Sequence, residues 1–232
     1  MPKPARQLSD LVGQARRYGV RDEAVLAAIG TVPRQSFVPR RLAAAAYDDG
    51  PLPIGEGQTI SQPAMVAMMA EAAQLQPSDS VLEVGAGSGY GALVLRALAG
   101  RVVTIERKPG LAEKARSALA GQELGDVKVV VGDGTLGWPA DAPYNAVVVT
   151  AAGPAPPPPL LQQLAPGGRL VMPVGSRHRD QFLMRYTRPA ASDVGGNGDG
   201  GNPVLAEECR AERLTAVRFV PLIGAHGFGS GR

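Results

Sequence analysis

Five short, valine-rich runs recur through the middle of the chain, and glycine or a polar residue ends most of them. They span residues 80–84, 102–105, 127–131, 146–150 and 169–172. Segments with helical spacing, residues 90–99 and 111–119, separate the first three runs. Continuous apolar runs of this length are typical of strands buried on both faces of a parallel sheet. The pattern predicts an α/β fold with a doubly wound, Rossmann-like sheet.

The region before this core combines helices with a loop. Residues 8–29 have the apolar spacing of short amphipathic helices interrupted at Gly19, and residues 42–47 and 64–75 are also predicted to be helical. Between the last two, residues 51–63 are so rich in Gly and Pro that we expect an ordered loop. The fold is therefore expected to carry an N-terminal helical addition.

The end of the chain is predicted to be looser. Residues 189–203 mostly lack a side chain or favour turns, so burial cannot repay the entropy of ordering them, and we expect a flexible loop. Residues 216–220 predict a final strand. We treat the chain as one domain, residues 1–232, with four parts: N-terminal helices and a covering loop (1–79), the α/β core (80–188), the flexible loop (189–203) and a C-terminal strand and tail (204–232).

The composition argues against several classes of protein. The net charge is only +3 and the basic residues are dispersed, so we expect no nucleic-acid partner. One cysteine, Cys209, and two histidines without metal-ligand spacing predict neither a disulfide nor a bound metal. The sequence contains no apolar run of membrane-spanning length and no signal-peptide pattern at its N-terminus. We therefore expect a cytoplasmic protein with no membrane partner.

A glycine turn follows the first predicted strand. Gly85-Ala86-Gly87-Ser88-Gly89 opens a helix, so its backbone N–H groups can face a ligand without intervening side chains. Its Gly-x-Gly-x-Gly spacing is tighter than the Gly-x-Gly-x-x-Gly of dinucleotide-binding proteins. The turn therefore indicates a nucleotide-like cofactor and disfavours NAD.

Carboxylates end the next two predicted strands. Glu106 can accept hydrogen bonds from both hydroxyls of a ribose, and Asp133 can reach toward an adenine amino group. The residues that follow them, Arg107 and Gly134, are assigned to the same site. Either carboxylate alone could be an ordinary solvated strand end, but their register with the glycine turn favours a binding role. The layout resembles S-adenosylmethionine-dependent methyltransferases over residues 80–173.

Glu83 lies inside the first predicted strand, where burying a carboxylate is unfavourable unless it has a partner. The resemblance implies that this residue helps to position the amino-acid part of S-adenosyl-L-methionine. A carboxylate that accepts hydrogen bonds from the nearby glycine amides is equally compatible, and the two roles are not exclusive. The resemblance also implies S-adenosyl-L-homocysteine as the product and no metal.

No general base is apparent near the glycine turn. The sequence has no His-Asp or Cys-His arrangement, and His178 and His226 lie far along the chain. An acceptor that is already nucleophilic near neutral pH would need no base. A carboxylate is such an acceptor, because its ordinary pKa is about 4.

The loop upstream of the glycine turn carries the most specific signal. Residues 51–63, Pro-Leu-Pro-Ile-Gly-Glu-Gly-Gln-Thr-Ile-Ser-Gln-Pro, strongly resemble the protein-L-isoaspartate O-methyltransferase family. The resemblance extends over about residues 8–222 through further segments: Phe37-Val-Pro39, Val81–Tyr90, Gly132-Asp-Gly134, Gly137-Trp-Pro139, Val149–Ala152, Pro173-Val-Gly175 and Val217–Leu222. So many ordered segments are far more specific than a glycine turn alone.

This resemblance implies transfer of a methyl group from S-adenosyl-L-methionine to the α-carboxylate of an L-isoaspartyl residue. Such residues arise by damage at Asn and Asp. The ester then closes to a succinimide, which hydrolyses partly to normal aspartate, so methylation initiates repair. The implied partners are isoaspartyl-containing proteins and peptides, and we expect the enzyme to act as a monomer.

Ser61 matches the family's active-site serine. We assign its hydroxyl to orienting the substrate carboxylate and not to a covalent intermediate, because no base is available to activate it. Its alternative role is to cap the helix that begins near Pro63. Further substrate-binding residues are expected in the same loop and at the end of the fourth predicted strand: Gln58, Thr59, Ile60, Gln62, Thr150 and Ala151.

The chain departs from the family's pattern in three places. Gly153 stands where a further Ala usually precedes proline, Phe228 stands where Trp is common, and residues 189–203 are unusually rich in glycine. These differences affect the expected peptide recognition and C-terminal closure, but not the reaction class. Two other functions are weighed: a carboxylate methyltransferase for a dedicated biosynthetic peptide, and a cofactor-binding module without turnover. The absence of an appended recognition domain disfavours the first, and the intact residues 53–63 disfavour the second.

Overall fold

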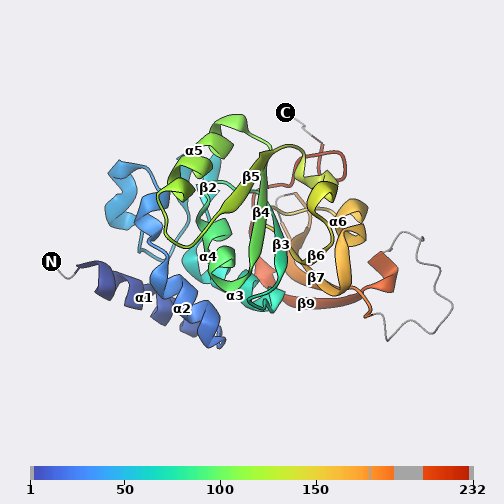
Figure 1. Cartoon of the computed structure of the whole chain (residues 1–232), viewed down its shortest axis with the longest axis horizontal. Helices are drawn as coiled ribbons and strands as arrows, with labels where there is room; N and C mark the ends of the chain where they lie inside the picture. Colours follow the sequence, from blue (N-terminus) through green and yellow to red (C-terminus); the bar gives the residue numbers. More distant parts are fainter. Residues whose placement is uncertain (1–2, 178, 191–205, 230–232) are drawn as a thin grey trace.

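A mixed seven-stranded sheet forms the centre of the molecule (Figure 1). The structure is a computed structural model, and it describes residues 3–177, 179–190 and 206–229. The strand order is β5-β4-β3-β6-β7-β8-β9, and helices pack on both faces. Residues 191–203 of the predicted flexible loop, and His178, lie outside the described residues.

The five predicted core strands are confirmed, and they pair in parallel. They are β3 (Ser80–Val84), β4 (Arg101–Glu106), β5 (Val127–Val131), β6 (Tyr144–Val149) and β7 (Leu164–Gly175). The first of them in the sequence, β3, lies between β4 and β6, so the chain winds outward in one direction and then in the other. A doubly wound sheet binds ligands at such a switch point, beyond the carboxyl ends of the strands.

The prediction of a final strand at residues 216–220 is wrong in position. Two antiparallel strands, β8 (Gln181–Thr187) and β9 (Arg210–Val217), extend the sheet beyond β7. Strand β9 is the edge strand, and its residues are exposed or half-buried. Because charged residues interrupt its sequence, it lacks the continuous apolar run by which the other strands were predicted. The apolar residues that follow cross the carboxyl edge of the sheet, where Pro221 pairs with Ala152.

Strand β5 forms the opposite edge and also departs from expectation. Its residues are half-buried or exposed, and Val131 is 43% exposed, although the valine-rich run predicted burial on both faces. A run of β-branched residues therefore identified the strand correctly but not its place at the edge of the sheet.

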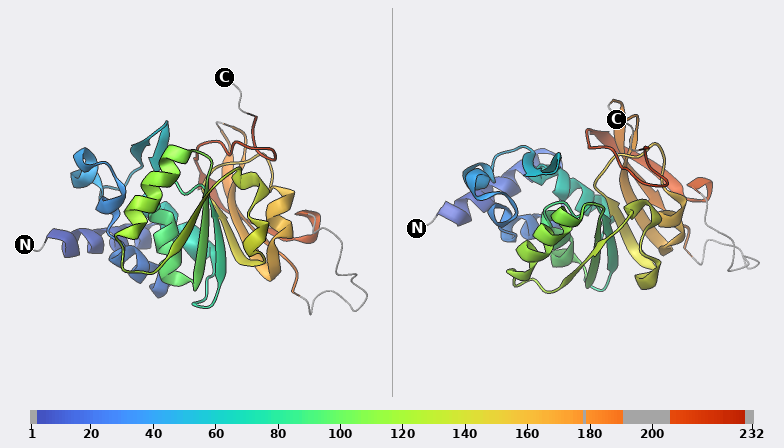
Figure 2. Two further views of the ribbon diagram at one scale, coloured as in Figure 1. Left: turned by 45° about the horizontal axis from the view of Figure 1, so that its top comes forward. Right: turned by 90° about the horizontal axis from the view of Figure 1, so that it is seen from above.

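The helices form two layers, one on each face of the sheet, and alternate side chains of each strand point to the two layers in turn. One face, with Val81, Val102 and Val148, packs against the layer that holds α1 (Lys3–Arg17), α2 (Glu23–Thr31), α3 (Pro63–Ala73), α4 (Tyr90–Leu98) and α5 (Pro109–Ala120). The other face, with Leu82 and Val147, packs against α6 (Pro158–Gln162). The alternation follows the two-residue period of a strand. Figure 2 shows the N-terminal helices at one end of the molecule and the C-terminal strands at the other.

Residues 51–63 were expected to form an ordered loop, and residues 52–60 of this segment form a β-hairpin. Strands β1 (Leu52–Gly55) and β2 (Gln58–Ile60) pair antiparallel around Glu56 and Gly57, which both have positive φ angles, +50° and +71°. Positive φ at both central residues is the requirement of a type I′ turn. Short 3₁₀ helices fill several connections: η1 (Arg34–Phe37), η2 (Arg40–Ala45, where a helix was predicted at 42–47), η3 (Gly134–Leu136), η4 (Pro139–Asp141) and η5 (Ala206–Glu208).

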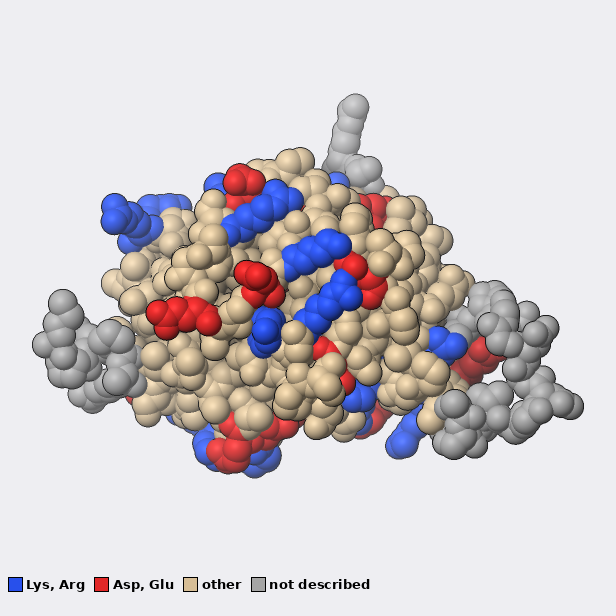
Figure 3. All heavy atoms as spheres, viewed as in Figure 1, with Lys and Arg blue, Asp and Glu red and all other residues tan. Residues whose placement is uncertain are grey.

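Positive and negative side chains are interspersed on the face shown in Figure 3. Lys128 and Arg101 both form ion pairs with Asp141. Charge on this face is therefore mixed, without a field of a single sign. In the part of the chain that the structure describes, no helix has both the length and the apolar character needed to cross a membrane.

Candidate active site

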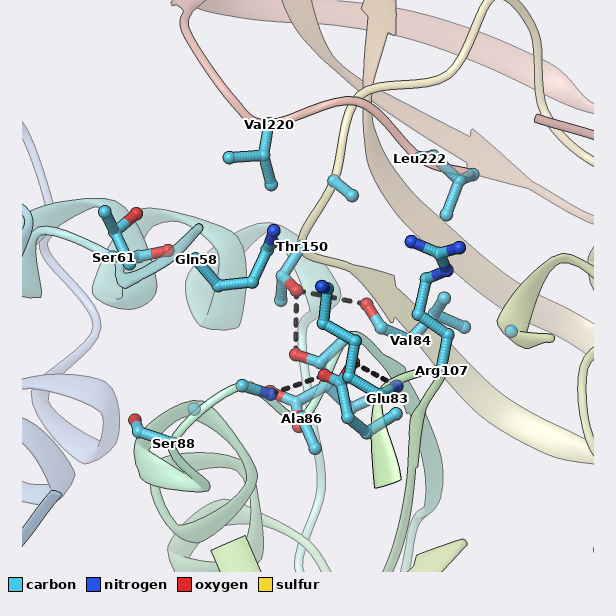
Figure 4. A pocket seen from close by; sticks show the side chains of 18 of the residues that line it. Gln58, Ser61, Glu83, Val84, Ala86, Ser88, Arg107, Thr150, Val220 and Leu222 are labelled. Atoms are coloured by element: carbon cyan, nitrogen blue, oxygen red, sulfur yellow. Dashed lines mark hydrogen bonds between the residues drawn. The ribbon is translucent and has the colours of Figure 1, made fainter. Parts of the chain in front are cut away.

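A cavity of about 220 Å³ opens at the switch point of the sheet. The glycine turn, the carboxyl ends of β3, β4 and β6, the hairpin strand β2 and the C-terminal segment Val220–Ile223 line it (Figure 4). Figure 4 shows Gln58 and Ser61 on one side and Glu83 and Ala86 on another. The chain therefore brings together most of the residues that the sequence analysis assigned to a cofactor and an acceptor.

The glycine turn is shaped by conformations and contacts that a side chain would not tolerate. Gly85 has φ +101°, and a Cβ there would collide with Oγ1 of Thr150. Thr150 in turn donates from that oxygen to the carbonyls of Val84 (3.1 Å) and Gly85 (2.9 Å). The ends of β3 and β6 are thus locked together at the base of the cavity, and the backbone of the turn is left open to a ligand.

Glu106 holds the turn from the neighbouring strand. Its carboxylate accepts hydrogen bonds from the backbone N–H of Gly87 (3.0 Å) and of Lys108 (3.0 Å), and only 6% of the residue is exposed. Glu106 lines the cavity together with Arg107. An oriented carboxylate at this position has acceptor capacity left for a further pair of donors.

Glu83 is the most deeply buried carboxyl group of the cavity wall, with 1% exposure. Burial raises its pKa to about 8; the hydrogen bond from Oγ1 of Thr104 (2.5 Å) opposes this shift and the charge of Glu106 adds to it. Gly91 makes room for it, because a Cβ at Gly91 would collide with Oε1 of Glu83. The cavity therefore contains a carboxyl group that favours a positively charged partner.

Asp133 does not line the cavity, although its neighbour Gly134 does. Its Oδ1 accepts from the backbone N–H and hydroxyl of Thr135 (2.9 and 2.7 Å), and its Oδ2 accepts from the backbone N–H of Ala225 (2.7 Å). Partial burial alone would raise the pKa of Asp133, but these hydrogen bonds hold it below the ordinary value. The carboxylate therefore anchors the C-terminal segment, and the expected contact between Asp133 and an adenine stays a prediction.

The acceptor segment, residues Gln58–Gln62, borders the cavity with four of its five members. The exception is Gln62, whose Nε2 donates to Oδ1 of Asp49 at 2.6 Å. The carbonyl of Ser61 accepts a hydrogen bond from the guanidinium of Arg34 at 2.9 Å. Gln62 occupies the N-cap position of α3 without a capping hydrogen bond from its side chain, so the alternative role of Ser61 as the cap does not apply.

The wall opposite the acceptor segment comes from two elements. Thr150 and Ala151 line the cavity, while Gly89 does not and instead occupies the N-cap position of α4. Val220–Ile223 line it too, and the sequence analysis did not assign them to the site. Their only signals were the resemblance of Val217–Leu222 to the family and the apolar run at 216–220, which was interpreted as a strand. Tyr90, Gly91 and Lys108 also line the cavity without having been predicted.

His226 is distant from the predicted site residues in the sequence but close to one of them in the structure. It lies far along the chain, yet its backbone N–H donates to Oγ1 of Thr135 (3.2 Å) beside Asp133. The described residues that line the cavity include neither histidine nor cysteine. Nor do the described residues contain a group of three His, Cys, Asp or Glu side chains placed to hold a metal ion.

Sequence relatives share nearly the whole chain. The family model described as Protein-L-isoaspartate(D-aspartate) O-methyltransferase (PCMT) matches residues 6–201. Protein-L-isoaspartate O-methyltransferase 1 of Rhodopseudomonas palustris (strain HaA2) is 54% identical over 217 residues, which is 94% of this chain and 82% of the relative. The corresponding protein 1 of Geotalea uraniireducens (strain Rf4) is 51% identical over 210 residues, covering 90% of this chain and 89% of the relative.

Solved structures agree with this relationship. A protein-L-isoaspartate O-methyltransferase superposes with a TM-score of 0.77 at 26% identity, over 95% of this chain and 67% of that chain. A Plasmodium falciparum protein assigned to the same activity and solved with S-adenosyl-L-homocysteine superposes with a TM-score of 0.71 at 22% identity, over 92% and 96%. The second likeness concerns the fold alone, which confirms the predicted Rossmann-like architecture. The chain belongs to the protein-L-isoaspartate O-methyltransferase family.

Proposed function

We propose that this protein transfers a methyl group from S-adenosyl-L-methionine to the α-carboxylate of L-isoaspartyl residues in damaged proteins and peptides, and so initiates their repair. The observation that carries the proposal is the cavity itself. It joins the glycine turn, which suits a cofactor, to the acceptor segment with Ser61, inside a chain that belongs to this family. S-Adenosyl-L-homocysteine is the corresponding product.

The residues of the cavity fit this cofactor. The backbone of the glycine turn lines the cavity, and two carboxyl groups, those of Glu83 and Glu106, line it from adjacent strands. A Cβ on Gly85 would collide with Oγ1 of Thr150, and a Cβ on Gly91 would collide with Oε1 of Glu83, so both positions need glycine. Glu83 suits the cationic amino group of the cofactor's amino-acid part, and Glu106 suits the two hydroxyls of its ribose. When bound, the cofactor supplies an electrophilic methyl group on a sulfonium. The chain's own contribution is to bind and orient it.

The acceptor requires no base from the protein. An isoaspartyl α-carboxylate is ionised near neutral pH, because its ordinary pKa is near 4 or lower. We assign Ser61 to donate a hydrogen bond that orients this carboxylate, with Gln58, Thr59 and Ile60 alongside it and Thr150 and Ala151 opposite. Alignment of nucleophile and methyl donor then supplies most of the acceleration.

The direct test is turnover of an isoaspartyl peptide and of its aspartyl twin with radiolabelled S-adenosyl-L-methionine. We expect label on the isoaspartyl peptide only. Equal labelling of both peptides would contradict the proposed substrate.

Ser61→Ala tests the acceptor role. Loss of a hydrogen bond to a charged group predicts a fall in kcat/KM of about 10- to 100-fold, while the affinity for S-adenosyl-L-homocysteine is retained. Ser117→Ala, at an exposed position of α5, is the matched control. Unchanged turnover in Ser61→Ala would remove Ser61 from the mechanism.

The remaining expectations are part of the same proposal. We infer that the enzyme acts on isoaspartyl proteins as a monomer in the cytoplasm. Light scattering of the purified protein measures its oligomeric state directly, and a stable dimer would contradict the expected monomer.

A further inference from the structure

Arg34 is a fully buried arginine in η1, with 0% exposure, and it lies outside every residue set assigned above. Arginine is almost never buried completely unless its charge has partners. Burial lowers the pKa of Arg34 to about 10, opposed by the nearby Tyr90 and Asp49, so the guanidinium remains charged near neutral pH. A charge kept at this depth needs a structural or functional reason.

The guanidinium of Arg34 joins three segments of backbone. Nη1 donates to the carbonyl of Ala46 (3.1 Å), and Nη2 donates to the carbonyls of Gly50 (3.1 Å) and Ser61 (2.9 Å). Nε is buried without a hydrogen-bond partner among the described residues. The two terminal nitrogens of Arg34 therefore reach three backbone carbonyls, one of them in the acceptor segment, while Nε is left without a partner among the described residues.

The same guanidinium contacts the cofactor end of the cavity. Its Cζ lies 5.6 Å from the ring centroid of Tyr90, within the range of a cation–π interaction. Tyr90 is the first residue of α4, directly after the glycine turn, and it lines the cavity. Phe37 also packs edge-on against that ring, with 5.8 Å between the ring centroids. Arg34 is thus in contact with both the acceptor segment and the cavity wall next to the glycine turn.

We propose that Arg34 is a positioning residue that sets the place of Ser61 relative to Tyr90, and thereby the distance between the bound acceptor and the methyl donor. A planar fork of donors can span separated carbonyls and stack on an aromatic ring, which the compact ammonium of lysine cannot do together. The proposal rests on the proposed function for its kinetic consequence. Its structural consequence, an ordered acceptor segment, is independent of the substrate.

The experiment compares Arg34→Lys and Arg34→Met with Arg169→Met. Arg169 is a matched control because it also donates to two backbone carbonyls, those of Ala73 (2.8 Å) and Gln74 (2.9 Å), at the end of α3. A misplacement of about 1 Å can reduce turnover by about 100-fold, so we expect a fall of this order in kcat for Arg34→Met. Arg34→Lys is expected to lose somewhat less. The affinity of both for S-adenosyl-L-homocysteine, measured by calorimetry, should stay near that of the wild type.

Two readouts distinguish positioning from simple stabilisation. Amide hydrogen exchange in residues 58–62 should accelerate in both Arg34 variants with S-adenosyl-L-homocysteine bound, and should not change in Arg169→Met. Guanidinium ion, added well below denaturing concentrations, should partly restore turnover to Arg34→Ala.

The outcomes separate the two proposals. Equal losses of kcat in the Arg34 and Arg169 variants, or unchanged exchange in residues 58–62, would overturn the role of Arg34. If the wild type labels isoaspartyl and aspartyl peptides equally, the proposed function fails, and the exchange experiment still decides the role of Arg34.

Discussion

The two sides of the cavity are built in different ways. The cofactor side consists of the glycine turn with Glu83 and Glu106, and it comes from the ends of two adjacent parallel strands. The acceptor side consists of residues 58–62, and it is held through Arg34 and Asp49, which lie in separate earlier segments. The first is set by local strand-turn-helix geometry, whereas the second depends on long-range hydrogen bonds. Damage to one side should therefore leave the other measurably intact.

Gly85→Ala is the strongest way to break the cofactor side alone. The substitution places a Cβ against Thr150 and imposes φ +101° on a residue with a side chain. Strain on the order of 1–3 kcal/mol corresponds to about 10- to 100-fold weaker binding, to which the collision adds. We expect calorimetry to show a loss of S-adenosyl-L-homocysteine affinity of about 100-fold or more.

The matched control for Gly85→Ala is Gly19→Ala. Gly19 has a similar φ of +97° but no atom within 4 Å of an added Cβ, so it carries only the backbone strain. It should lose stability while keeping full affinity. Equal affinities of the two variants would show that the contact between Gly85 and Thr150 is unimportant. Hydrogen exchange in residues 58–62 should be unaffected by either.

Glu83→Gln tests the protonation state of the buried carboxyl group on the cofactor side. The folded protein keeps the proton of Glu83 up to about pH 8, whereas the unfolded chain releases it near the ordinary value of 4.5. The stability contribution is therefore fully present below the unfolded pKa and is lost as the pH rises through the folded one. The variant should lack this loss and be more stable than the wild type at pH 7, on the order of 2 kcal/mol.

The measurement for Glu83→Gln is urea unfolding between pH 5 and pH 9. Glu123→Gln, at an exposed position, provides the control and should follow the wild type. A variant whose free energy of unfolding falls with pH as steeply as the wild type would show that Glu83 is ionised in the folded protein. The same variant should also bind S-adenosyl-L-homocysteine less tightly, because an amide, unlike the carboxyl group of Glu83, cannot ionise next to the ligand's cationic amino group.

Asp133→Ala gives the smallest effect and sharpens the boundary between the two sides. Because Asp133 holds Ala225, its loss should free the C-terminal segment that supplies Val220–Ile223 to the cavity. We expect about 1 kcal/mol of lost stability. Its pKa is lowered in the folded state, so the contribution is present above the unfolded value and disappears as the pH falls.

Hydrogen exchange at Ala225 and affinity for S-adenosyl-L-homocysteine distinguish the two roles of Asp133. We expect faster exchange with a modest change in affinity, and Asp126→Ala, at the exposed position directly before β5, should change neither. A large loss of affinity without faster exchange would restore the adenine contact that the strand-end pattern suggested.

The sequence predicted which residues meet on the cofactor side of the cavity, because the signals of these residues are local. Glycines with positive φ must follow β3 at fixed spacing, and a carboxylate at the end of β4 falls beside them by the register of parallel strands. Asp133 follows the same rule of strand ends but does not line the cavity, and its contact with an adenine stays a prediction. Strand β5 is at the edge of the sheet, and there the C-terminal segment takes up the carboxylate.

The acceptor side was predicted only through its family resemblance. Ser61 and its neighbours lack a spacing that points to their chemistry, and their support comes from Arg34, separated from Ser61 by 27 residues. Residues 216–220 were predicted as a strand, and Val220 at its end instead lines the cavity, because an apolar run has the same appearance whether it pairs in a sheet or covers a cavity.

What the sequence determined by itself was the parallel core, the glycine turn at the end of its first strand and the carboxylates within and beside it, because strand period and turn geometry act over a few residues. The tertiary structure alone decided which carboxylates face the cavity, which segment closes it and how Ser61 is held. These depend on hydrogen bonds between groups distant in the chain, such as those from Arg34 to Ser61 and from Ala225 to Asp133. Such bonds leave no periodic trace in the sequence.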